Sequence, residues 1–246
     1  MNKLAILAFT LLVFFSSMLW YLANGSLNEY LKSQVELQGH YYSGQTTTLN
    51  LAEFSPQTGI ATFDQLNLTN LNNYQAQHVL VIDKAQVELS QNQNSQLLLT
   101  ISKVSINKLT LNLEQKPNEE TNIEKLTQRI RLKLANDYPQ LYPEISAKLY
   151  AENNPELSAD KYAASHPQSG PMVEHTKQKK KRDKPQQKII ISAINIKTIE
   201  LNTIENGVTN SIEKHNVNIS TIGNKEGFEK NQIGGEFLLR LLNLVE

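Results

Sequence analysis

Val104-Ser-Ile-Asn-Lys-Leu-Thr-Leu111 has apolar residues at its first, third, sixth and eighth positions. The same spacing occurs in Ala61–Leu68 and again in Ile194–Leu201. In a strand that alternates strictly, the sixth and eighth side chains would lie on the opposite face from the first and third. The spacing therefore predicts curved strands in which a bulge, or a kink where the strand changes partner, returns the apolar residues to one face. A chance match in a chain rich in Ile, Leu and Asn is the alternative.

Further strands are predicted between residues 33 and 89, where apolar and polar residues alternate. Ser43-Gly44 and Pro56–Gly59 are expected turns between them. We expect antiparallel strands joined by short turns. The residues predicted to face inward are Val35, Leu37, Tyr41, Leu49, Leu51, Val79, Val81, Ala85, Val87 and Leu89, with Asp83 as an exception in the last strand.

Helices are predicted in the second half of the chain. Thr121-Asn-Ile-Glu124 is a capping box, which predicts a helix near 122–135, and a second helix is expected near 143–152. Gly234 to Glu246 reads as a helix that is apolar around most of its circumference, with Gly234-Gly235 read as a turn before it. Such a helix must be covered, by one end of the sheet or by a partner.

The expected fold class is α+β: an N-terminal transmembrane helix, then a twisted, mostly antiparallel β-sheet with a few packing helices. Residues 1–25 form the anchor and 26–150 a β-rich region that includes the helices near 122–135 and 143–152. Residues 151–188 form a disordered basic insertion. Residues 189–246 complete the same domain with a β-hairpin, turned at Asn206-Gly207, and the C-terminal helix.

The membrane anchor is predicted from Leu4 to Ala23, a run of 20 residues without a charge. As a helix it would span about 30 Å, the hydrocarbon thickness of a bilayer. Lys3 precedes the run, so the N-terminus is expected in the cytoplasm and the residues after Asn24 outside it. A signal peptide cleaved near Ala23-Asn24-Gly25 is the alternative. The principal anchor residues are Leu4, Leu7, Leu11, Phe14, Phe15 and Trp20.

The basic insertion contains six Lys or Arg residues within eight positions, which could contact anionic lipid headgroups. A solvated loop without a partner is the alternative. The residues concerned are Lys177, Lys179, Lys180, Lys181, Arg182 and Lys184.

Composition and motifs argue against several classes of function. The chain has 24 basic and 24 acidic residues, which gives no bias toward nucleic acid, and it has no cysteine. Its five histidines have no metal-ligand spacing, and no phosphate-binding loop or nucleophile motif occurs. We therefore expect no catalytic, cofactor-binding or metal residues, and a protein that is not an enzyme.

The order of these features resembles a short member of the AsmA-like family of bacterial envelope proteins. The similarity lies in the N-terminal anchor and in three later segments. These are Gly59–Leu71 followed by Tyr74 and Gln77–Leu89, then Leu98–Leu113 leading to Asn122-Ile-Glu-Lys-Leu, and Ile219–Gly227 before the terminal helix. The resemblance implies a twisted antiparallel sheet with an apolar concave face, anchored once in the inner membrane and facing the periplasm.

The expected function is that of a non-enzymatic, membrane-anchored periplasmic protein that contacts or shields lipids in outer-membrane assembly or lipid homeostasis. The alternative is an envelope scaffold that binds a protein partner through its apolar sheet face and C-terminal helix. Expected partners are membrane lipids and an envelope protein, but neither nucleic acid nor metal. The two hypotheses differ in whether the apolar face of the sheet is an open groove or is covered by helices.

Overall fold

The computed structural model describes residues 27–90, 97–153, 187–205, 207–223 and 226–245. The predicted anchor Leu4–Ala23 and the basic run Lys177–Lys184 lie outside these residues. Within them, no helix combines the length and the apolar character needed to cross a membrane.

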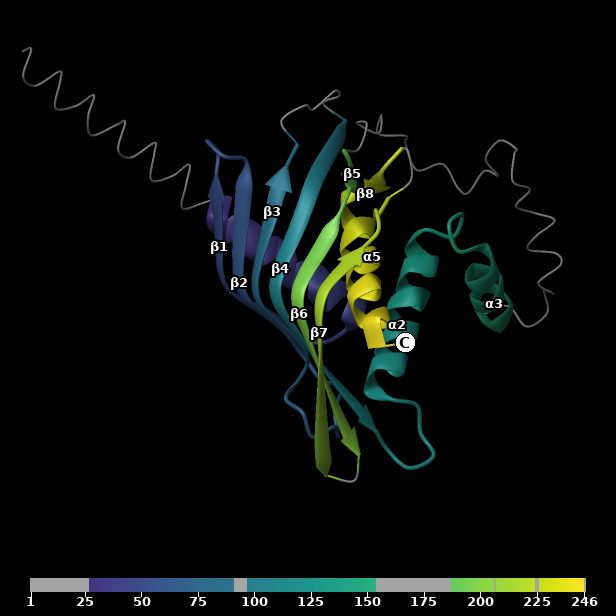
Figure 1. The fold of residues 1–246 in the computed structure, drawn as a ribbon. Coiled ribbons are helices and arrows are strands. Elements are labelled where there is room, and N and C mark those ends of the chain that lie inside the picture. The colour runs from purple at the N-terminus through teal and green to yellow at the C-terminus, as the bar shows by residue number, and fades with distance from the viewer. Residues whose placement is uncertain (1–26, 91–96, 154–186, 206, 224–225, 246) are drawn as a thin grey trace, which may run out of the picture.

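The described residues form one mixed sheet of eight strands in an α+β fold (Figure 1). Its order is β1-β2-β3-β4, after which one part of β4 pairs with β5 and the other part with β6. β4 runs parallel to both of these strands, and the other pairs are antiparallel. The strands are β1 (Thr47–Ser55), β2 (Ile60–Thr69), β3 (His78–Leu89), β4 (Leu98–Gln115), β5 (Lys188–Ile191), β6 (Ile194–Glu205), β7 (Val208–Ile219) and β8 (Phe228–Glu229).

The spacing first seen in Val104–Leu111 recurs in all of the longer strands and is aligned across the sheet. In β3, for example, the inward residues are Leu80, Ile82, Ala85 and Val87, and each pairs with the matching position of β2 and β4. Between the third and sixth positions, two consecutive residues interrupt each strand. These pairs are Asn50-Leu51, Asp64-Gln65, Asp83-Lys84, Asn107-Lys108, Lys197-Thr198 and His215-Asn216.

The interruption is a kink shared by neighbouring strands rather than a bulge. The register is the same on both sides of it, so no strand contains an extra residue relative to its neighbour at this place. Gln65 and Asn216 have positive φ angles of 50° and 54° there. Among the described strands the register shifts only at strand ends, between Leu68 and Thr69 and between Glu88 and Leu89. The predicted bulge was therefore wrong. A kink where the strand changes partner, the other prediction, is not found at this place either, because β4 changes partner earlier, between Ile101 and Val104.

The kink also corrects two of the predicted inward faces. Leu51 belongs to an interrupting pair and is 41% exposed, although alternation with Leu49 placed it inside. In β3, Asp83 is not an isolated exception. It and Lys84 form the interrupting pair, and the prediction missed Leu80 and Ile82, which lie in the core before them. Val79 is buried as predicted, at 1% exposed, whereas Val81 is only partly buried.

Residues 27–43 form a helix, where a strand through Val35, Leu37 and Tyr41 was predicted. That prediction was wrong because the sheet-facing side chains follow a helical spacing. Leu37 is 55% exposed and Tyr41 43%, whereas Tyr42 is 1% exposed. At Gly39 the helix comes so close to β1 that an added Cβ would lie 2.4 Å from Thr47 Oγ1.

Polar side chains at four-residue intervals tie helix 27–43 to the edge of the sheet. Asn28 Oδ1 accepts the N–H of Phe54 at 3.0 Å, and Glu36 Oε1 accepts the N–H of Leu49 at 2.9 Å. Two further side chains belong to the same row. Lys32 Nζ donates a hydrogen bond to Asn50 O at 3.3 Å, and His40 Nδ1 lies within hydrogen-bond distance of Gln45 O, at 3.1 Å. Among the described residues β1 has no neighbouring strand on this side, so the contacts to Leu49, Asn50 and Phe54 satisfy backbone groups that an edge strand would leave exposed.

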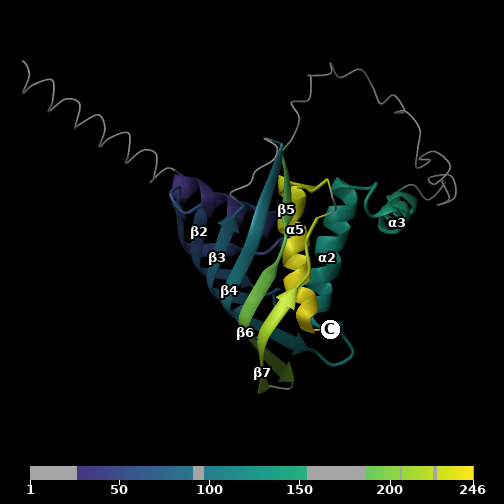
Figure 2. The ribbon, with the colours of Figure 1, turned by 45° about the horizontal axis from the view of Figure 1, so that its top comes forward.

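The other helices lie on the same side of the curved sheet as helix 27–43 (Figures 1 and 2). They are α2 (Asn122–Asp137), α3 (Pro143–Asn153) and α5 (Lys230–Leu242), followed by a short 3-10 helix η1 (Asn243–Val245). The capping box is confirmed, since Thr121 Oγ1 accepts the N–H of Glu124 and the Glu124 carboxylate accepts that of Thr121. α3 packs on α2, where Ser146 Oγ donates to Ala135 O at 2.9 Å.

Gly234 and Gly235 lie inside α5, so the predicted turn at these residues was wrong. A Cβ on Gly235 would lie 2.9 Å from Leu134 Cδ2 and 3.0 Å from the ring of Tyr42. Glycine is therefore needed here because three helices meet at close range, not because the chain turns.

The sheet has two distinct ends, which we name after residues of the first helix and the loop that follows it. The Asn28 end holds the turn 56–59 and the starts of β4 and β5. The Gln45 end holds the loops 70–77 and 116–121 and the junction of β6 and β7. In Figure 1 these are the upper and lower ends of the molecule.

Candidate functional site

The apolar face of the sheet is filled by the protein's own helices. Leu126, Ile130 and Leu134 of α2 are each 0% exposed, as is Leu242 of α5. They share one core cluster with the inward residues of β3, β4 and β6. In the described residues this face is therefore a packed core and not an open groove.

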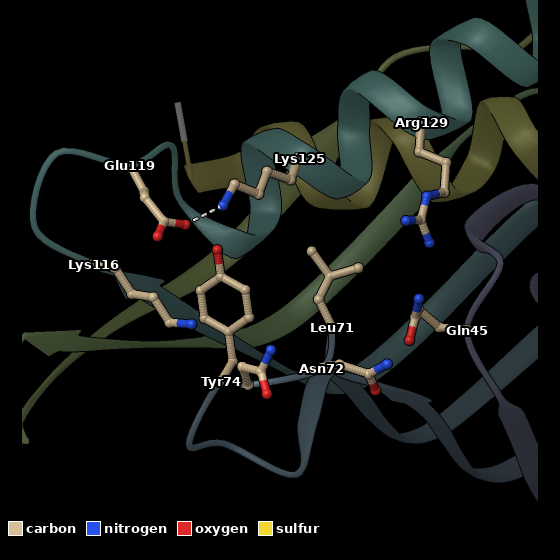
Figure 3. Close-up of a pocket in the computed structure, with 9 residues that line it drawn as sticks. Gln45, Leu71, Asn72, Tyr74, Lys116, Glu119, Lys125 and Arg129 are labelled. Atoms are coloured by element: carbon tan, nitrogen blue, oxygen red, sulfur yellow. Dashed lines mark hydrogen bonds and ion pairs between the residues drawn. The ribbon is translucent and has the colours of Figure 1, made fainter.

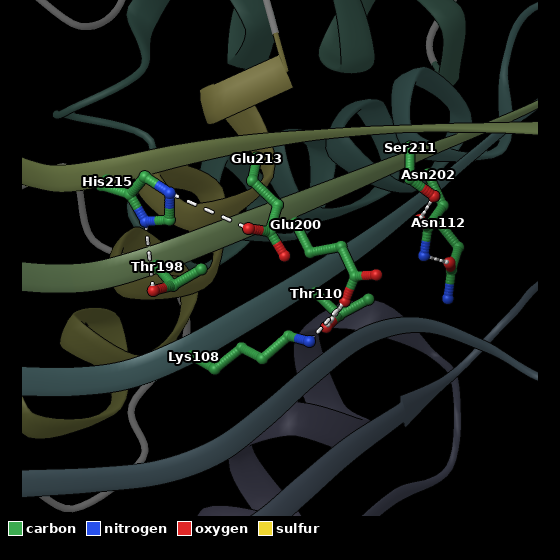
Figure 4. Close-up of polar contacts among 9 residues, drawn as sticks. All are labelled: Lys108, Thr110, Asn112, Thr198, Glu200, Asn202, Ser211, Glu213 and His215. Carbon is green, nitrogen blue, oxygen red and sulfur yellow. Dashed lines mark hydrogen bonds and ion pairs between the residues drawn. The ribbon is translucent and has the colours of Figure 1, made fainter.

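The outer face of β4, β6 and β7 is polar (Figure 4). Lys108 Nζ lies 2.7 Å from Glu200 Oε2, which also accepts a hydrogen bond from Thr110 at 3.2 Å. The hydrogen bond between Lys108 and Glu200 raises the pKa of the lysine and lowers that of the carboxyl. Beside them Asn202 donates to Asn112 at 2.9 Å. The hydrogen-bonding groups of these side chains satisfy one another.

A pocket of about 360 Å³ opens at the Gln45 end (Figure 3). Three separate segments form it: the loop 70–77, the loop 116–121 with the first turns of α2, and the chain leading into β1. The lining residues are Gln45, Leu71, Asn72, Asn73, Tyr74, Lys116, Glu119, Lys125 and Arg129.

Asn122 holds two of these segments together from within the core. The side chain is 0% exposed, and its amide donates to Asn70 Oδ1 at 3.0 Å and to Asn112 O at 2.8 Å. Its Oδ1 accepts the N–H of Glu114 at 2.9 Å. The end of β4, the start of α2 and the start of loop 70–77 are thus fixed to one another.

Glu114 fixes the far side of loop 70–77. It is 4% exposed, and its carboxylate accepts the N–H of Gln75 at 2.7 Å and that of Ala76 at 3.2 Å. Hydrogen bonds to an ionised acceptor are among the stronger ones in proteins. The loop that carries Tyr74 therefore has a defined position, and the pocket is formed in advance of any ligand.

Positive charge gathers around the ring of Tyr74. Lys116 Nζ lies 4.4 Å from the ring centroid and Lys125 Nζ 5.7 Å from it. Lys125 also contacts Glu119 Oε2 at 2.5 Å, which raises the pKa of the lysine and lowers that of the carboxyl. Arg129, one turn further along α2, donates to Ser43 O at 3.2 Å. Three cations and one carboxylate line the pocket, giving it a net charge of +2.

This pocket was not predicted from the sequence. Lys125 and Arg129 are four residues apart on a helix after a capping box, which places them on one side of it, and that spacing was the available signal. The lysines and arginine predicted to contact lipid lie outside the described residues, as do the predicted anchor residues. Among the residues that are described, no group of His, Asp or Glu is arranged to hold a metal ion.

Comparisons of the chain with protein-family models, with curated proteins and with solved structures find no match in any of the three.

Proposed function

We propose that this chain is a non-enzymatic, membrane-anchored protein of the periplasmic envelope that acts as a scaffold. The observation that carries the proposal is the attachment of helix 27–43 to β1. Only residues 24–26 separate this helix from the uncharged run Leu4–Ala23. Because Asn28 is already bound to the sheet, a membrane helix at 4–23 would hold the folded domain directly at the bilayer surface.

In this arrangement the Asn28 end lies next to the bilayer and the Gln45 end lies away from it. β4 joins the two ends with 18 residues, which corresponds to about 60 Å along the strand at 3.3 Å per residue. A scaffold of this shape presents its far end to molecules in the periplasm.

The basic run supports the same orientation through its position in the chain. Lys184 is four residues before Lys188, the first residue of β5 at the Asn28 end. Four residues reach at most about 14 Å, so the run is tethered to the end that we place at the membrane. We propose that Lys177, Lys179, Lys180, Lys181, Arg182 and Lys184 contact anionic lipid headgroups there.

The packed apolar face favours the scaffold over a protein that shields lipid chains, because the protein's own helices occupy the face of the sheet where the chains would lie. It also moves the expected protein contact away from the sheet face and α5. β7 is the exposed alternative: its outer edge has no partner strand among the described residues, and Val208 and Ile212 are 61% and 58% exposed. We propose that an extended segment of an envelope protein pairs with this edge.

Site-specific photocrosslinking in intact cells tests this function. A photoreactive residue at Val208 or Ile212 should give one discrete adduct, and the same residue at Leu51 or Leu132 should not. Leu51 and Leu132 are suitable controls because they are exposed apolar residues, at 41% and 38%, away from β7. Equal adduct patterns at all four positions, or none at any of them, would contradict the scaffold.

A further inference from the structure

We infer that the pocket around Tyr74 binds a phosphate-bearing ligand. This inference goes beyond the scaffold proposal and does not depend on the membrane anchor. It rests on the charge, the hydrogen-bond donors and the rigidity of the pocket.

The charge of the pocket sets it apart from the rest of the chain. The whole sequence is electrically balanced, with 24 basic and 24 acidic residues, but the pocket carries three cations and one carboxylate. The ion pair Lys108–Glu200 on the outer face, in contrast, is neutral as a unit. A phosphate monoester carries close to two negative charges at neutral pH and would balance the excess.

Hydrogen-bond donors surround the same space. Arg129 has five N–H donors, and one of its nitrogens is used on Ser43 O. Figure 3 shows its guanidinium on the side of Gln45, across the pocket from Tyr74 and Lys116. Gln45, Asn72 and Asn73, which each carry a side-chain amide, also line the space. Arginine and amide donors on several sides suit the three acceptor oxygens of a phosphate.

The cations are held in place before a ligand arrives. Lys116 and Lys125 lie over the ring of Tyr74, whose loop is fixed by Asn122 and Glu114. Little ordering of the protein is then required on binding, which favours affinity.

The carboxylate of Glu119 competes with a bound phosphate for Lys125. Its carboxylate binds Lys125 and reduces the positive charge that a phosphate would meet. Removing this charge should strengthen phosphate binding, whereas a pocket with a purely structural role would show no such gain.

The test is titration calorimetry of the full chain in neutral detergent micelles at low ionic strength. The probes are inorganic phosphate, glycerol 3-phosphate, dihexanoyl phosphatidic acid below its micellar concentration, and acetate. We expect saturable binding of the phosphates, at least tenfold tighter for glycerol 3-phosphate than for acetate. Arg129→Gln and Lys116→Gln should each weaken it about tenfold or more, and Glu119→Gln should tighten it severalfold.

Arg131→Gln is the matched control, because Arg131 is exposed on the same helix but does not line the pocket. Circular dichroism checks that each variant is folded. If glycerol 3-phosphate and phosphatidic acid bind with equal affinity, the ligand is a soluble phosphate ester. If phosphatidic acid binds tenfold more tightly, the ligand is a lipid headgroup. Absence of saturable phosphate binding by the folded wild-type protein, equal binding of acetate, or an equal loss in Arg131→Gln would overturn the inference.

Discussion

The carboxylate of Glu36 accepts the backbone N–H of Leu49 at 2.9 Å, joining helix 27–43 to the outer edge of β1. This bond is one of a row at four-residue intervals, so the helix takes the place of a further strand. These hydrogen bonds cover the free edge of β1. They also join helix 27–43 to the sheet, and the proposed anchoring of the domain at the membrane depends on this connection.

Replacing Glu36 tests that link. Glu36→Ala leaves the N–H of Leu49 without its acceptor and should lower the free energy of unfolding by about 1–3 kcal/mol. Glu36→Gln keeps an acceptor oxygen and should cost less. Urea unfolding measures both, with Glu29→Ala as the control, since Glu29 is exposed on the same helix. The link is refuted if Glu36→Ala and Glu29→Ala have the same stability.

The two adjacent glycines of α5 should respond to alanine in opposite directions. At Gly235 an added Cβ would collide with Leu134 and Tyr42, and overpacking of this kind costs about 1–3 kcal/mol. At Gly234 the nearest atom, Cβ of Gln38, is 3.4 Å from the added Cβ, so the gain in helix propensity of up to about 1 kcal/mol should prevail if Gln38 shifts slightly. Thermal unfolding of both variants measures the difference. Equal loss in the two would show that the three helices do not meet as described.

The pH dependence of stability should report on Glu236. Burial raises the pKa of its carboxyl above the ordinary value of 4.5, while Arg240 acts in the opposite direction. As the pH rises through about 4.5, the unfolded chain releases this proton and the folded protein retains it. The free energy of unfolding therefore falls with rising pH until the folded pKa is passed.

Glu236→Gln removes this contribution and keeps an acceptor for the hydroxyl of Tyr142. Relative to wild type, the variant should gain stability between pH 4 and pH 7. Urea unfolding at both pH values measures the gain, with Glu53→Gln as an exposed control. A constant difference between variant and wild type across this range would count against a raised pKa.

The apolar spacing is present in more strands than were recognised from the sequence. Three strands were identified by apolar residues at positions one, three, six and eight. β7 has the same spacing, but Lys214 occupies its third position, which hides the pattern. In β3 the spacing is complete, but the alternation of Val79 and Val81 concealed Leu80 and Ile82, which also lie in the core. Only pairing with neighbouring strands shows which residues continue the spacing.

The pocket and the first helix show the limits of local patterns. Val35, Leu37 and Tyr41 alternate as in a strand, yet Leu37 and Tyr41 are exposed on a helix, because contacts with distant β1 determine its conformation. The pocket joins residues from Gln45 to Arg129, and their proximity follows from strand register and from the buried Asn122. Neither is encoded within one local window.

The central claim is that the Asn28 end is held at the bilayer and the Gln45 end away from it. The chain has no cysteine, so single fluorophores can be attached at Thr58→Cys in the turn 56–59 and at Val208→Cys. Both sites are exposed. In liposomes with a headgroup-linked quencher, the account predicts strong quenching at residue 58 and little at residue 208. Equal quenching at the two sites, or stronger quenching at residue 208, would contradict it.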